Sequence, residues 1–221
     1  VEPIVQGASG MRMYDPEFLR ELRRACDAYH SLLIVDEVFT GYGRTGKMWA
    51  CDHAGITPDL MCLGKSFAAL FPMGALLTSD RVFDAFRGGP ERALYYGHTF
   101  CGNPLGAALA REVLAIYRDE HIIERMQEKS RIIAAAFARI EKLPAIASVR
   151  TLGMIGAADF RGDGGYLGGA GWRVYEEAKK RGAYLRPLGD TVYVTPPLTI
   201  EPSDLERLLS ILEESIVAAT L

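Results

Sequence analysis

Short apolar runs and longer amphipathic stretches alternate along most of this chain. Residues 32–35 form a continuous apolar run that ends at Asp36. The run is too short for a helix and too uniform for a strand with one solvated face, so it predicts a parallel strand that is buried on both faces. Residues 60–63, just before Lys65, and residues 75–78 predict two further strands.

Helices are predicted between and after these strands. Asp15 can cap a helix that has Pro16 in its first position. Its apolar residues repeat at helical spacing, and they are Phe18, Leu19, Leu22 and Cys26. A longer helical stretch begins at Asn103 and ends near Pro144. Because helices and strands alternate, the sequence favours an α/β fold.

The character of the chain changes after this long helix. The sequence predicts a strand over residues 154–160, a glycine-rich connection over 162–171, a helix over 172–181, a strand over 192–195 and a last helix. We expect two domains. Residues 1–125 would be the C-terminal part of a large domain with the start of an interdomain helix, and residues 126–221 would be a small α+β domain.

The last helix is predicted from its start signal and its apolar stripe. Ser203 and Glu206 have the spacing of a capping box. The predicted buried stripe consists of Leu205, Leu208, Leu209, Leu212 and Ile216.

Composition narrows the class of protein. With 221 residues, 49% of them apolar, the chain is long enough to bury one large core or two smaller ones. Its net charge of −3 comes from well-mixed acids and bases, which argues against a nucleic-acid partner. The four cysteines are scattered and form no ligand cluster with the histidines, so no metal is expected.

Features of targeting are also absent from the sequence. Charge or glycine interrupts every apolar stretch well short of a membrane span, so no membrane segment is expected. No basic-then-apolar leader opens the chain, and the cytoplasm is the expected location. Residues 1–7 predict a strand-to-loop passage without an initiator Met, so the chain is expected to begin inside a domain.

A glycine-rich loop gives the first candidate for a ligand site. Residues 41–46 satisfy the pattern G-x-G-x-x-G, and with Lys47 they approach a P-loop. However, Asp36 and Glu37 precede this loop, and two carboxylates would repel a pyrophosphate. Met48 stands where a P-loop needs Ser or Thr to hold magnesium. A tight turn is therefore favoured, and a nucleotide-binding oxidoreductase or NTPase stays as an alternative.

Asp36 and Lys65 are the candidates for catalysis, and each has two interpretations. A carboxylate at the end of a buried strand needs a cationic partner, which can be an arginine or the protonated ring nitrogen of a cofactor. Lys65 can be a lysine whose head reaches solvent. If its apolar neighbours enclose it instead, burial favours the neutral amine that forms a Schiff base and moves protons.

Several strings in the sequence resemble one known family. Residues 34–38, the loop 41–46, the pair Pro58-Asp59 and the pair Gly64-Lys65 are similar in order and spacing to class III aminotransferases. The resemblance covers essentially the whole chain. It implies a fold type I architecture, to which this chain would contribute part of the large mixed-sheet domain and a small C-terminal α+β domain. It also implies pyridoxal 5'-phosphate (PLP) as the cofactor.

The resemblance implies roles for residues of the large domain. Asp36 would pair with the pyridine nitrogen of PLP, and Lys65 would hold the cofactor as a Schiff base. Thr99 would donate its hydroxyl and amide to the cofactor phosphate of the neighbouring subunit, with the His98 backbone beside it and Gly97 lining the substrate pocket. A homodimer with a shared phosphate site is therefore implied. Without the family, Thr99 would be interpreted as a cap of the following helix.

Two residues of the small domain complete the implied site. Arg186 would bind the carboxylate of a keto acid through its planar guanidinium group. Tyr193 would lie beside it and help to distinguish the two substrates. Without the resemblance, Arg186 would be interpreted as a surface arginine before a proline.

Within the class, further strings resemble the aminotransferases of biotin synthesis, namely residues 1–14, 186–189 and 193–197. This implies S-adenosylmethionine as the amino donor and 8-amino-7-oxononanoate as the keto acid acceptor. The nearest alternative is another class III enzyme that acts on ω-amino acids or diamines. Ala8 argues against it, because ornithine-like members usually carry glutamate there.

The sequence also departs from its family. Residues 68–71 replace a glycine pair that usually follows the catalytic lysine, and His98 stands where the biotin enzymes often have proline. The N-terminal half of the family, which normally supplies a phosphate turn and an aromatic residue on the ring, is not in this sequence. This chain alone is therefore expected to be inactive, and a catalytically silent scaffold is a third hypothesis.

Overall fold

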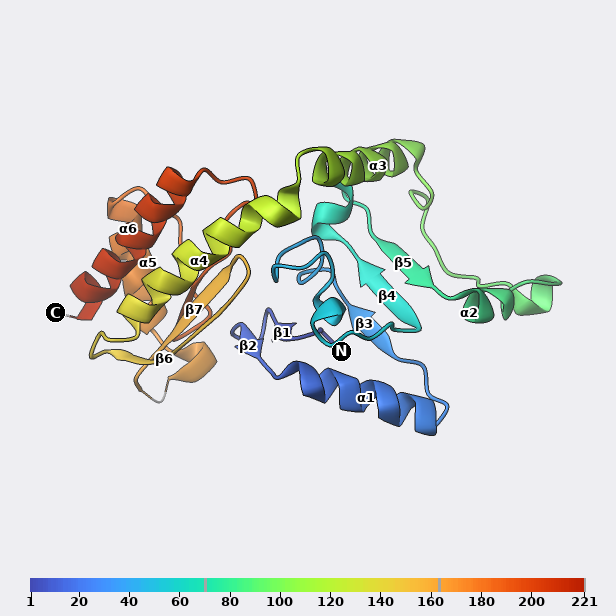
Figure 1. Cartoon of the computed structure of the whole chain (residues 1–221), viewed down its shortest axis with the longest axis horizontal. Coiled ribbons are helices and arrows are strands. Elements are labelled where there is room, and N and C mark those ends of the chain that lie inside the picture. Colours follow the sequence, from blue (N-terminus) through green and yellow to red (C-terminus); the bar gives the residue numbers. More distant parts are fainter. Residues whose placement is uncertain (70, 163, 221) are drawn as a thin grey trace. The chain divides into compact units, whose positions relative to one another are not determined.

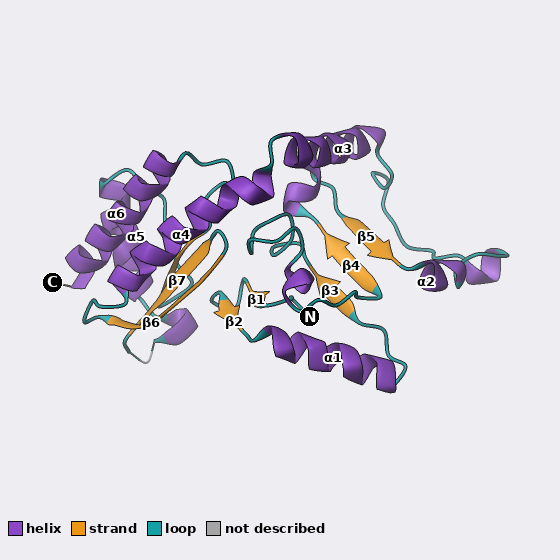
Figure 2. Ribbon diagram, viewed as in Figure 1, coloured by secondary structure: helices purple, strands orange, loops and turns teal. Residues whose placement is uncertain are grey.

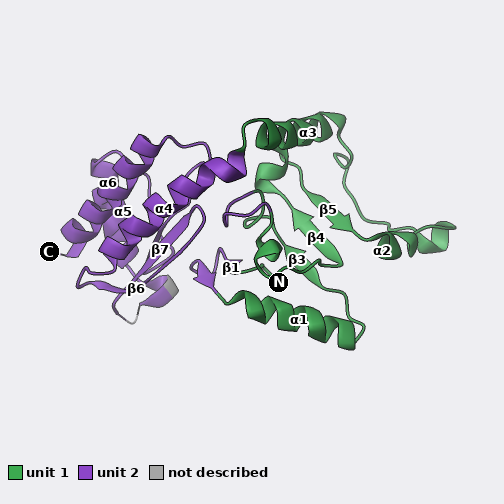
Figure 3. Ribbon diagram, in the orientation of Figure 1, with its two compact units in different colours: residues 1–4, 14–42, 49–121 green, residues 5–13, 43–48, 122–221 purple. Residues whose placement is uncertain are grey.

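The computed structural model of the chain describes residues 1–69, 71–162 and 164–220. These residues fall into two compact units, coloured separately in Figure 3. Unit 1 comprises residues 1–4, 14–42 and 49–121, and unit 2 comprises residues 5–13, 43–48 and 122–221. The expected domain boundary at residues 125 and 126 stays a prediction, and it falls inside a helix of unit 2.

Each unit combines helices with a three-stranded sheet (Figures 1 and 2). Unit 1 contains the helices α1 (Pro16–Ala28), α2 (Asp80–Asp84) and α3 (Pro104–Asp119), the strands β3 (Ile34–Asp36), β4 (Leu60–Leu63) and β5 (Ala75–Thr78), and the 3₁₀ helices η1 (Ala50–His53), η2 (Lys65–Ala68) and η3 (Pro90–Arg92). Unit 2 contains the helices α4 (Ile122–Ile140), α5 (Ala170–Lys180) and α6 (Pro202–Thr220), the strands β1 (Val5–Gln6), β2 (Arg12–Met13), β6 (Ile146–Leu152), β7 (Ile155–Phe160) and β8 (Thr191–Val194), and η4 (Gly165–Leu167).

The sheet of unit 1 has the order β3-β4-β5. β3 and β4 are parallel, with Ile34 opposite Leu60 and Asp36 opposite Cys62, which confirms the predicted parallel strand. β5 pairs with β4 in the antiparallel direction, so the sheet is mixed. Since parallel strands end at the same edge of a sheet, the segments that follow β3 and β4 leave the sheet side by side.

The burial predicted for β3 is only half correct. Val35 is fully buried, whereas Ile34 keeps 47% of its surface exposed and Asp36 is also exposed. Successive side chains of a strand point to opposite faces, so Val35 faces the core of unit 1 and its two neighbours face away. In the described part of the chain nothing buries this second face, and the prediction of a strand buried on both faces is wrong there.

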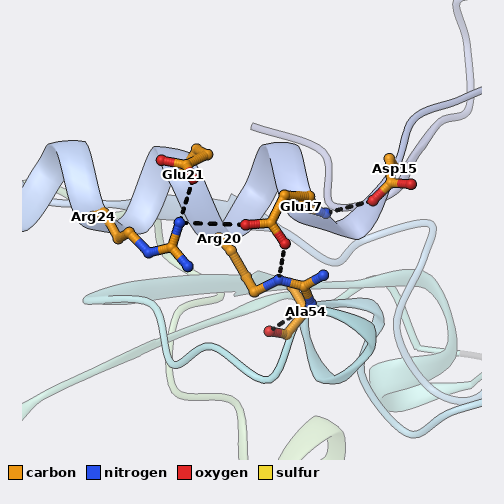
Figure 4. A network of polar contacts seen from close by, with 6 residues as sticks. All are labelled: Asp15, Glu17, Arg20, Glu21, Arg24 and Ala54. Atoms are coloured by element: carbon orange, nitrogen blue, oxygen red, sulfur yellow. Dashed lines mark hydrogen bonds and ion pairs between the residues drawn. The ribbon is translucent and has the colours of Figure 1, made fainter.

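α1 begins as predicted, with Asp15 accepting a hydrogen bond from the backbone N–H of Glu17 and Pro16 in the first position. Glu17, Arg20, Glu21 and Arg24 form a ladder of ion pairs along the helix surface, and Arg20 also donates to the carbonyl of Ala54 (Figure 4). Exposed pairs of this kind contribute little to stability each. The helix is fixed mainly through Leu19, which is fully buried.

The long helix predicted from Asn103 to Pro144 is two helices. Asn103 caps α3 by accepting a hydrogen bond from the N–H of Leu105, so the predicted start is correct. The helix ends at Asp119, and His121 has a φ of +51°, which interrupts the helical backbone before α4 begins at Ile122. The apolar repeat continues on both sides of this turn, and for that reason periodicity alone did not reveal the break.

In unit 2, the antiparallel sheet β6-β7-β8 packs against α4, and α5 and α6 pack on each other. β6 is not among the predicted strands, because Ile146 is its one buried residue. Gly156 of β7 lies under the ring of Phe137, where an added Cβ would be 2.2 Å from a ring carbon. Close packing therefore requires glycine at this point of the core.

The predicted stripe of α6 is confirmed, but its capping box is wrong. Leu205, Leu209, Leu212 and Ile216 are buried and Leu208 is half-buried. Pro202 already occupies the first helical position, as proline often does, so Ser203 lies inside the helix rather than before it.

Asp59 joins four segments of unit 1. Its carboxylate accepts hydrogen bonds from the N–H of Leu33 (2.8 Å), from Arg23 (2.7 Å) and from Arg81 (3.0 Å). The backbone bond from Leu33 and the Arg23 guanidinium lower the pKa of Asp59 to about 2. The side chain is 15% exposed, so the ion pair with Arg23 is partly shielded from water.

We expect the substitution Asp59→Asn to destabilise the protein by about 1–3 kcal/mol at pH 7, the range for hydrogen bonds to a charged group. The folded pKa lies below the unfolded value of about 4, so the carboxylate stabilises above pH 4 and loses its contribution as the pH falls towards 2. Urea unfolding at several pH values measures the difference between wild type and variant, which should shrink over this interval.

Asp27→Asn is the matched control, because Asp27 pairs with the same Arg23 on the exposed surface of α1. It should cost less than about 1 kcal/mol. A difference between wild type and Asp59→Asn that stays constant from pH 7 to pH 2 would contradict the electrostatic account.

Candidate active site

Asp36 and Lys65 lie at the same edge of the sheet of unit 1. Asp36 is the last residue of β3, and Lys65 follows β4 after a single glycine. Lys65 has a φ of +48°, a conformation that is costly for a residue with a side chain. Such backbone strain often marks functional positions, and here it occurs at the one lysine that the sequence singles out.

The turns that follow the two strands contact each other directly. An added Cβ on Gly64 would be 3.2 Å from a methyl carbon of Val38, so this glycine allows the turns to approach closely. Phe39 lies beside Lys65, with the Nζ atom 5.0 Å from the centre of its ring. This distance is typical of a cation–π interaction. The structure therefore brings the segments of Asp36 and Lys65 together.

The surroundings of Asp36 leave its carboxylate able to accept a cation. The N–H of Val38 donates to Oδ1 at 3.0 Å, and this bond closes the turn after β3. In the described residues no arginine pairs with Asp36, which argues against a structural ion pair as its reason for being there. Burial and the nearby Asp36 charge raise the pKa of the Cys62 thiol on the neighbouring strand.

The enclosure considered for Lys65 is not formed by the described residues, because the side chain is exposed. Of its apolar neighbours, Leu63 and Ala68 are buried, Phe67 is half-buried and Ala69 is exposed. The departure at residues 68–71 includes Leu70, which lies outside the described residues. Ala69 has a φ of +49°, so the backbone after Lys65 contains a second residue in the left-handed region.

Gly97, His98 and Thr99 lie in an exposed segment before α3. The N–H of Phe100 donates to Nδ1 of His98 at 3.2 Å, and the N–H of Cys101 donates to the His98 carbonyl at 2.9 Å. Thr99 therefore sits at the tip of a tight turn. The alternative role of Thr99 as a helix cap is wrong, since Asn103 caps α3.

Arg186 and Tyr193 line one cavity of unit 2, with a volume of about 370 Å³. The other lining residues include Tyr184, Pro197 and Leu208. The cavity thus combines one guanidinium group with aromatic and aliphatic walls, which suits a ligand with a carboxylate and an apolar chain.

Two cations hold the backbone of residues 196–200, a segment that forms part of the cavity wall. Arg44 donates to the carbonyl of Pro196 at 2.7 Å, and Lys129 donates to the carbonyls of Leu198 and Ile200. Lys129 is 5% exposed, and burial and the nearby Arg125 lower its pKa. Because their hydrogen bonds go to backbone carbonyls, both cations have a structural task that the sequence did not reveal.

The glycine-rich loop of residues 41–46 has a structural task as well. Its residues 43–46 pack on the β6–β7 hairpin, where the N–H of Met154 donates to the carbonyl of Arg44 at 2.9 Å. Gly153 in the hairpin has a φ of +56°, and a Cβ there would be 2.3 Å from the backbone of Thr45. The loop opens no α-helix, as a nucleotide loop would, and the favoured interpretation as a turn is in keeping with this geometry.

Sequence reasoning missed Glu37, a buried carboxylate in the turn after Asp36. It is 1% exposed and accepts hydrogen bonds from Thr40, Ala50 and Cys51. Burial and the Glu37 charge raise the pKa of Cys51 to about 12, so this thiol stays protonated and is no nucleophile. Burial alternates along β3 in the structure and places Glu37 on the inward face with Val35, but the uniformly apolar run 32–35 carries no signal of this alternation.

The donor set at the sheet edge fits PLP. The amine of Lys65, which can react with an aldehyde, and the carboxylate of Asp36, which pairs with no cation among the described residues, lie at the same sheet edge, and these are the two groups that a pyridine aldehyde requires. Among the described residues no cluster of His, Cys, Asp or Glu could hold a metal ion. Among the same residues, no helix is long and apolar enough to cross a bilayer.

The family model of the class-III aminotransferases matches residues 1–216, and the chain belongs to this family. Its members depend on PLP and transfer an amino group from a donor to a keto acceptor. The match also agrees with the predicted α/β architecture, which is that of fold type I aminotransferases.

Among named relatives, the chain is 41% identical to adenosylmethionine-8-amino-7-oxononanoate aminotransferase of Synechococcus elongatus, over 93% of this chain and 49% of that protein. The crystal structure of the enzyme with the same name from Methanocaldococcus jannaschii superposes with a TM-score of 0.94 at 32% identity, over 100% of this chain and 53% of that one. An ornithine aminotransferase from Toxoplasma gondii, described with partial occupancy of PLP at its active site, gives a TM-score of 0.86 at 30% identity, over 100% of this chain and 50% of that one. The chain spans about half the length of the curated relatives it matches.

Proposed function

We propose that this chain carries the lysine and the acid of a PLP site, and that the whole protein transfers the amino group of S-adenosylmethionine to 8-amino-7-oxononanoate. One observation supports the cofactor site above all. Asp36, which pairs with no cation among the described residues, and Lys65 leave the sheet from adjacent parallel strands, and their turns are in contact. The substrates are suggested by the names of the relatives at 41% and 37% identity.

Each of the two residues has a definite task in this proposal. Asp36 would hold a proton on the ring nitrogen, because an adjacent carboxylate favours the charged form of that nitrogen. The bound cofactor would supply an electron sink for the substrate carbon. Lys65 would attach the cofactor covalently through its amine and, once displaced by substrate, would move a proton from the α-carbon of the substrate to the former aldehyde carbon of the cofactor.

The exposed segment before α3 would hold the cofactor phosphate. Thr99 has a hydroxyl and a backbone N–H at the tip of a turn, and both are hydrogen-bond donors that suit an anion. His98 would contribute backbone, and Gly97 would line the substrate pocket. The segment is exposed in this chain, which is consistent with a phosphate bound across a homodimer interface.

Arg186 and Tyr193 would form the carboxylate end of the substrate site, since they line the same cavity of unit 2. A planar guanidinium can bind a carboxylate with two parallel hydrogen bonds, whereas an ammonium cannot. The apolar walls of the cavity would accommodate the aliphatic part of the keto acid.

A second candidate is a class III enzyme that acts on an ω-amino acid such as ornithine. The similarity to the ornithine aminotransferase of Toxoplasma gondii at 30% identity supports it. Ala8 argues against this candidate, because a methyl group there cannot pair with a substrate or protein cation. Both candidates use the same cofactor site.

The first test of the cofactor site is the substitution Lys65→Ala in the full-length protein. Wild type should show a visible absorption band with PLP that borohydride reduction removes, and the variant should lose both the band and turnover. Lys47→Ala is the control, because Lys47 belongs to the loop that a nucleotide site would use. A band that survives in Lys65→Ala would show that another residue holds the cofactor.

The amino donor can be tested in a half-reaction, without the keto acid. Adding S-adenosylmethionine to the full-length protein with PLP should bleach the visible band within one turnover, since the amino group passes to the cofactor. Ornithine and other ω-amino acids serve as comparison donors. Bleaching by an ω-amino acid but not by S-adenosylmethionine would favour the second candidate.

We expect Arg186→Lys and Arg186→Ala to raise the Michaelis constant for the keto acid by about tenfold or more, the effect of losing a hydrogen bond to a charged group. The half-reaction with the amino donor reports whether the loss is specific to the acceptor. Arg131→Ala, at an exposed position of α4, is the control. An unchanged Michaelis constant in Arg186→Lys would contradict the bidentate contact.

A further inference from the structure

Glu37 is the most deeply buried carboxylate of unit 1, and the proposed reaction gives it no task. Its side chain is 1% exposed. Thr40 donates its hydroxyl hydrogen to Oε2 at 2.6 Å, and the N–H of Ala50 donates to the same oxygen at 3.0 Å. The N–H of Cys51 donates to Oε1 at 2.9 Å. Both oxygens are therefore occupied by donors.

A buried carboxylate is expensive unless its oxygens are hydrogen-bonded. Burial raises the pKa of Glu37, while the bonds from Thr40, Cys51 and Ala50 lower it and offset part of that effect. Two of the three donors are backbone N–H groups at the start of η1, which have no partner inside that short helix. Glu37 thus ties the turn after β3 to η1.

The side chains of the turn form two pairs, and the two members of each pair are three residues apart in the sequence. Glu37 and Thr40 point inward and are buried, and they bond to each other. Asp36 is exposed and Phe39 is half-buried, so they form the outward pair. Fixing the inward pair therefore fixes the position of the outward pair as well.

The outward pair is the part of the turn that faces the reactive lysine. Phe39 lies 5.0 Å from Nζ of Lys65, and Asp36 is the acid at the end of β3. Further hydrogen bonds hold the ends of the turn, from the N–H of Glu37 to the carbonyl of Cys62 and from the N–H of Gly41 to the carbonyl of Glu37.

We propose that Glu37 is a positioning residue, which through its bonds to Thr40 and η1 holds Asp36 and Phe39 at fixed places beside Lys65. The inference rests on the proposed cofactor site, because it assigns Glu37 to the geometry of that site. Its charge matters as well as its shape, since three donors converge on it and it must accept all of them.

Glu37→Gln tests this requirement with almost no change in volume. The amide of glutamine has one oxygen and one NH₂ group, so at least one of the three donors would face another donor. The turn would then relax away from η1. Asp52→Asn is the matched control, because Asp52 is an exposed carboxylate at the same helix that accepts the N–H of Trp49 at 3.2 Å.

The measurements are made on the full-length protein. The dissociation constant of PLP is obtained by titrating the cofactor-free protein, and the pH midpoint of the visible band by titrating the loaded protein. Glu37→Gln should weaken PLP binding about 10- to 100-fold, the scale on which small displacements of reacting groups act. It should also move the pH midpoint by about half a unit or more. Asp52→Asn should change neither value.

The outcomes separate positioning from simple stabilisation. If Glu37→Gln lowers the melting temperature but binds PLP and titrates as wild type does, Glu37 only stabilises the fold and the inference is wrong. If Glu37→Gln does not fold, Thr40→Val removes the hydroxyl bond at nearly constant volume and should shift both values in the same direction by a smaller amount. Wild-type values in a folded Thr40→Val would then overturn the inference.

A failure of the proposed function would give a different experimental result from a failure of the positioning role. A wild-type protein that forms no visible band with PLP would refute the cofactor site itself. A wild-type band that Glu37→Gln leaves unchanged would refute the positioning role alone.

Discussion

The parallel pairing of β3 with β4 is the constraint on which the candidate site depends. Asp36 lies opposite Cys62, so β4 ends one residue later, at the same sheet edge as β3. Gly64 and Lys65 follow at that edge. An antiparallel pair would have put the two residues at opposite edges. The approach of the turns then requires Gly64, because a side chain there would press on Val38. The backbone pairing of the two strands is therefore enough to place Asp36 and Lys65 at the same sheet edge, without any side-chain contact.

Successive side chains at the end of β3 point to opposite faces, and this gives the two neighbouring carboxylates different roles. Asp36 points away from the core of unit 1 and has no cationic partner in the described residues, while Glu37 points inward and is satisfied by Thr40 and η1. A strand has a period of two residues, so two successive acids must face opposite sides. Asp36 is therefore available to a ligand, while Glu37 holds the turn to η1.

The sequence was sufficient to predict the parts of the fold that depend on local signals. The cap and first residue of α1, the three strands of unit 1 and the stripe of α6 agree with the structure. Features that depend on a single backbone angle or on distant partners were missed, such as the turn at His121 and the strand β6. In the site, the position of Asp36 at a strand end and the apolar neighbours of Lys65 made these two residues candidates, whereas Arg186 was indicated only by the resemblance to class III aminotransferases. The burial of Glu37 and the bonds of Lys129 to two carbonyls were not predictable, because the uniformly apolar run 32–35 does not mark an inward face and the carbonyls are distant in the sequence.

Burial and partner type distinguish several structural cations of unit 2 from Arg186. Lys129 is buried, and it and Arg44 donate to backbone carbonyls, while Arg150 pairs with Asp159 at 2.6 Å. These groups are occupied, and removing them would leave buried acceptors without donors. Arg186 is exposed, lines the cavity, and forms no ion pair with any described residue. Because its guanidinium retains its hydrogen-bonding capacity, Arg186 can still take the carboxylate-binding role proposed for it.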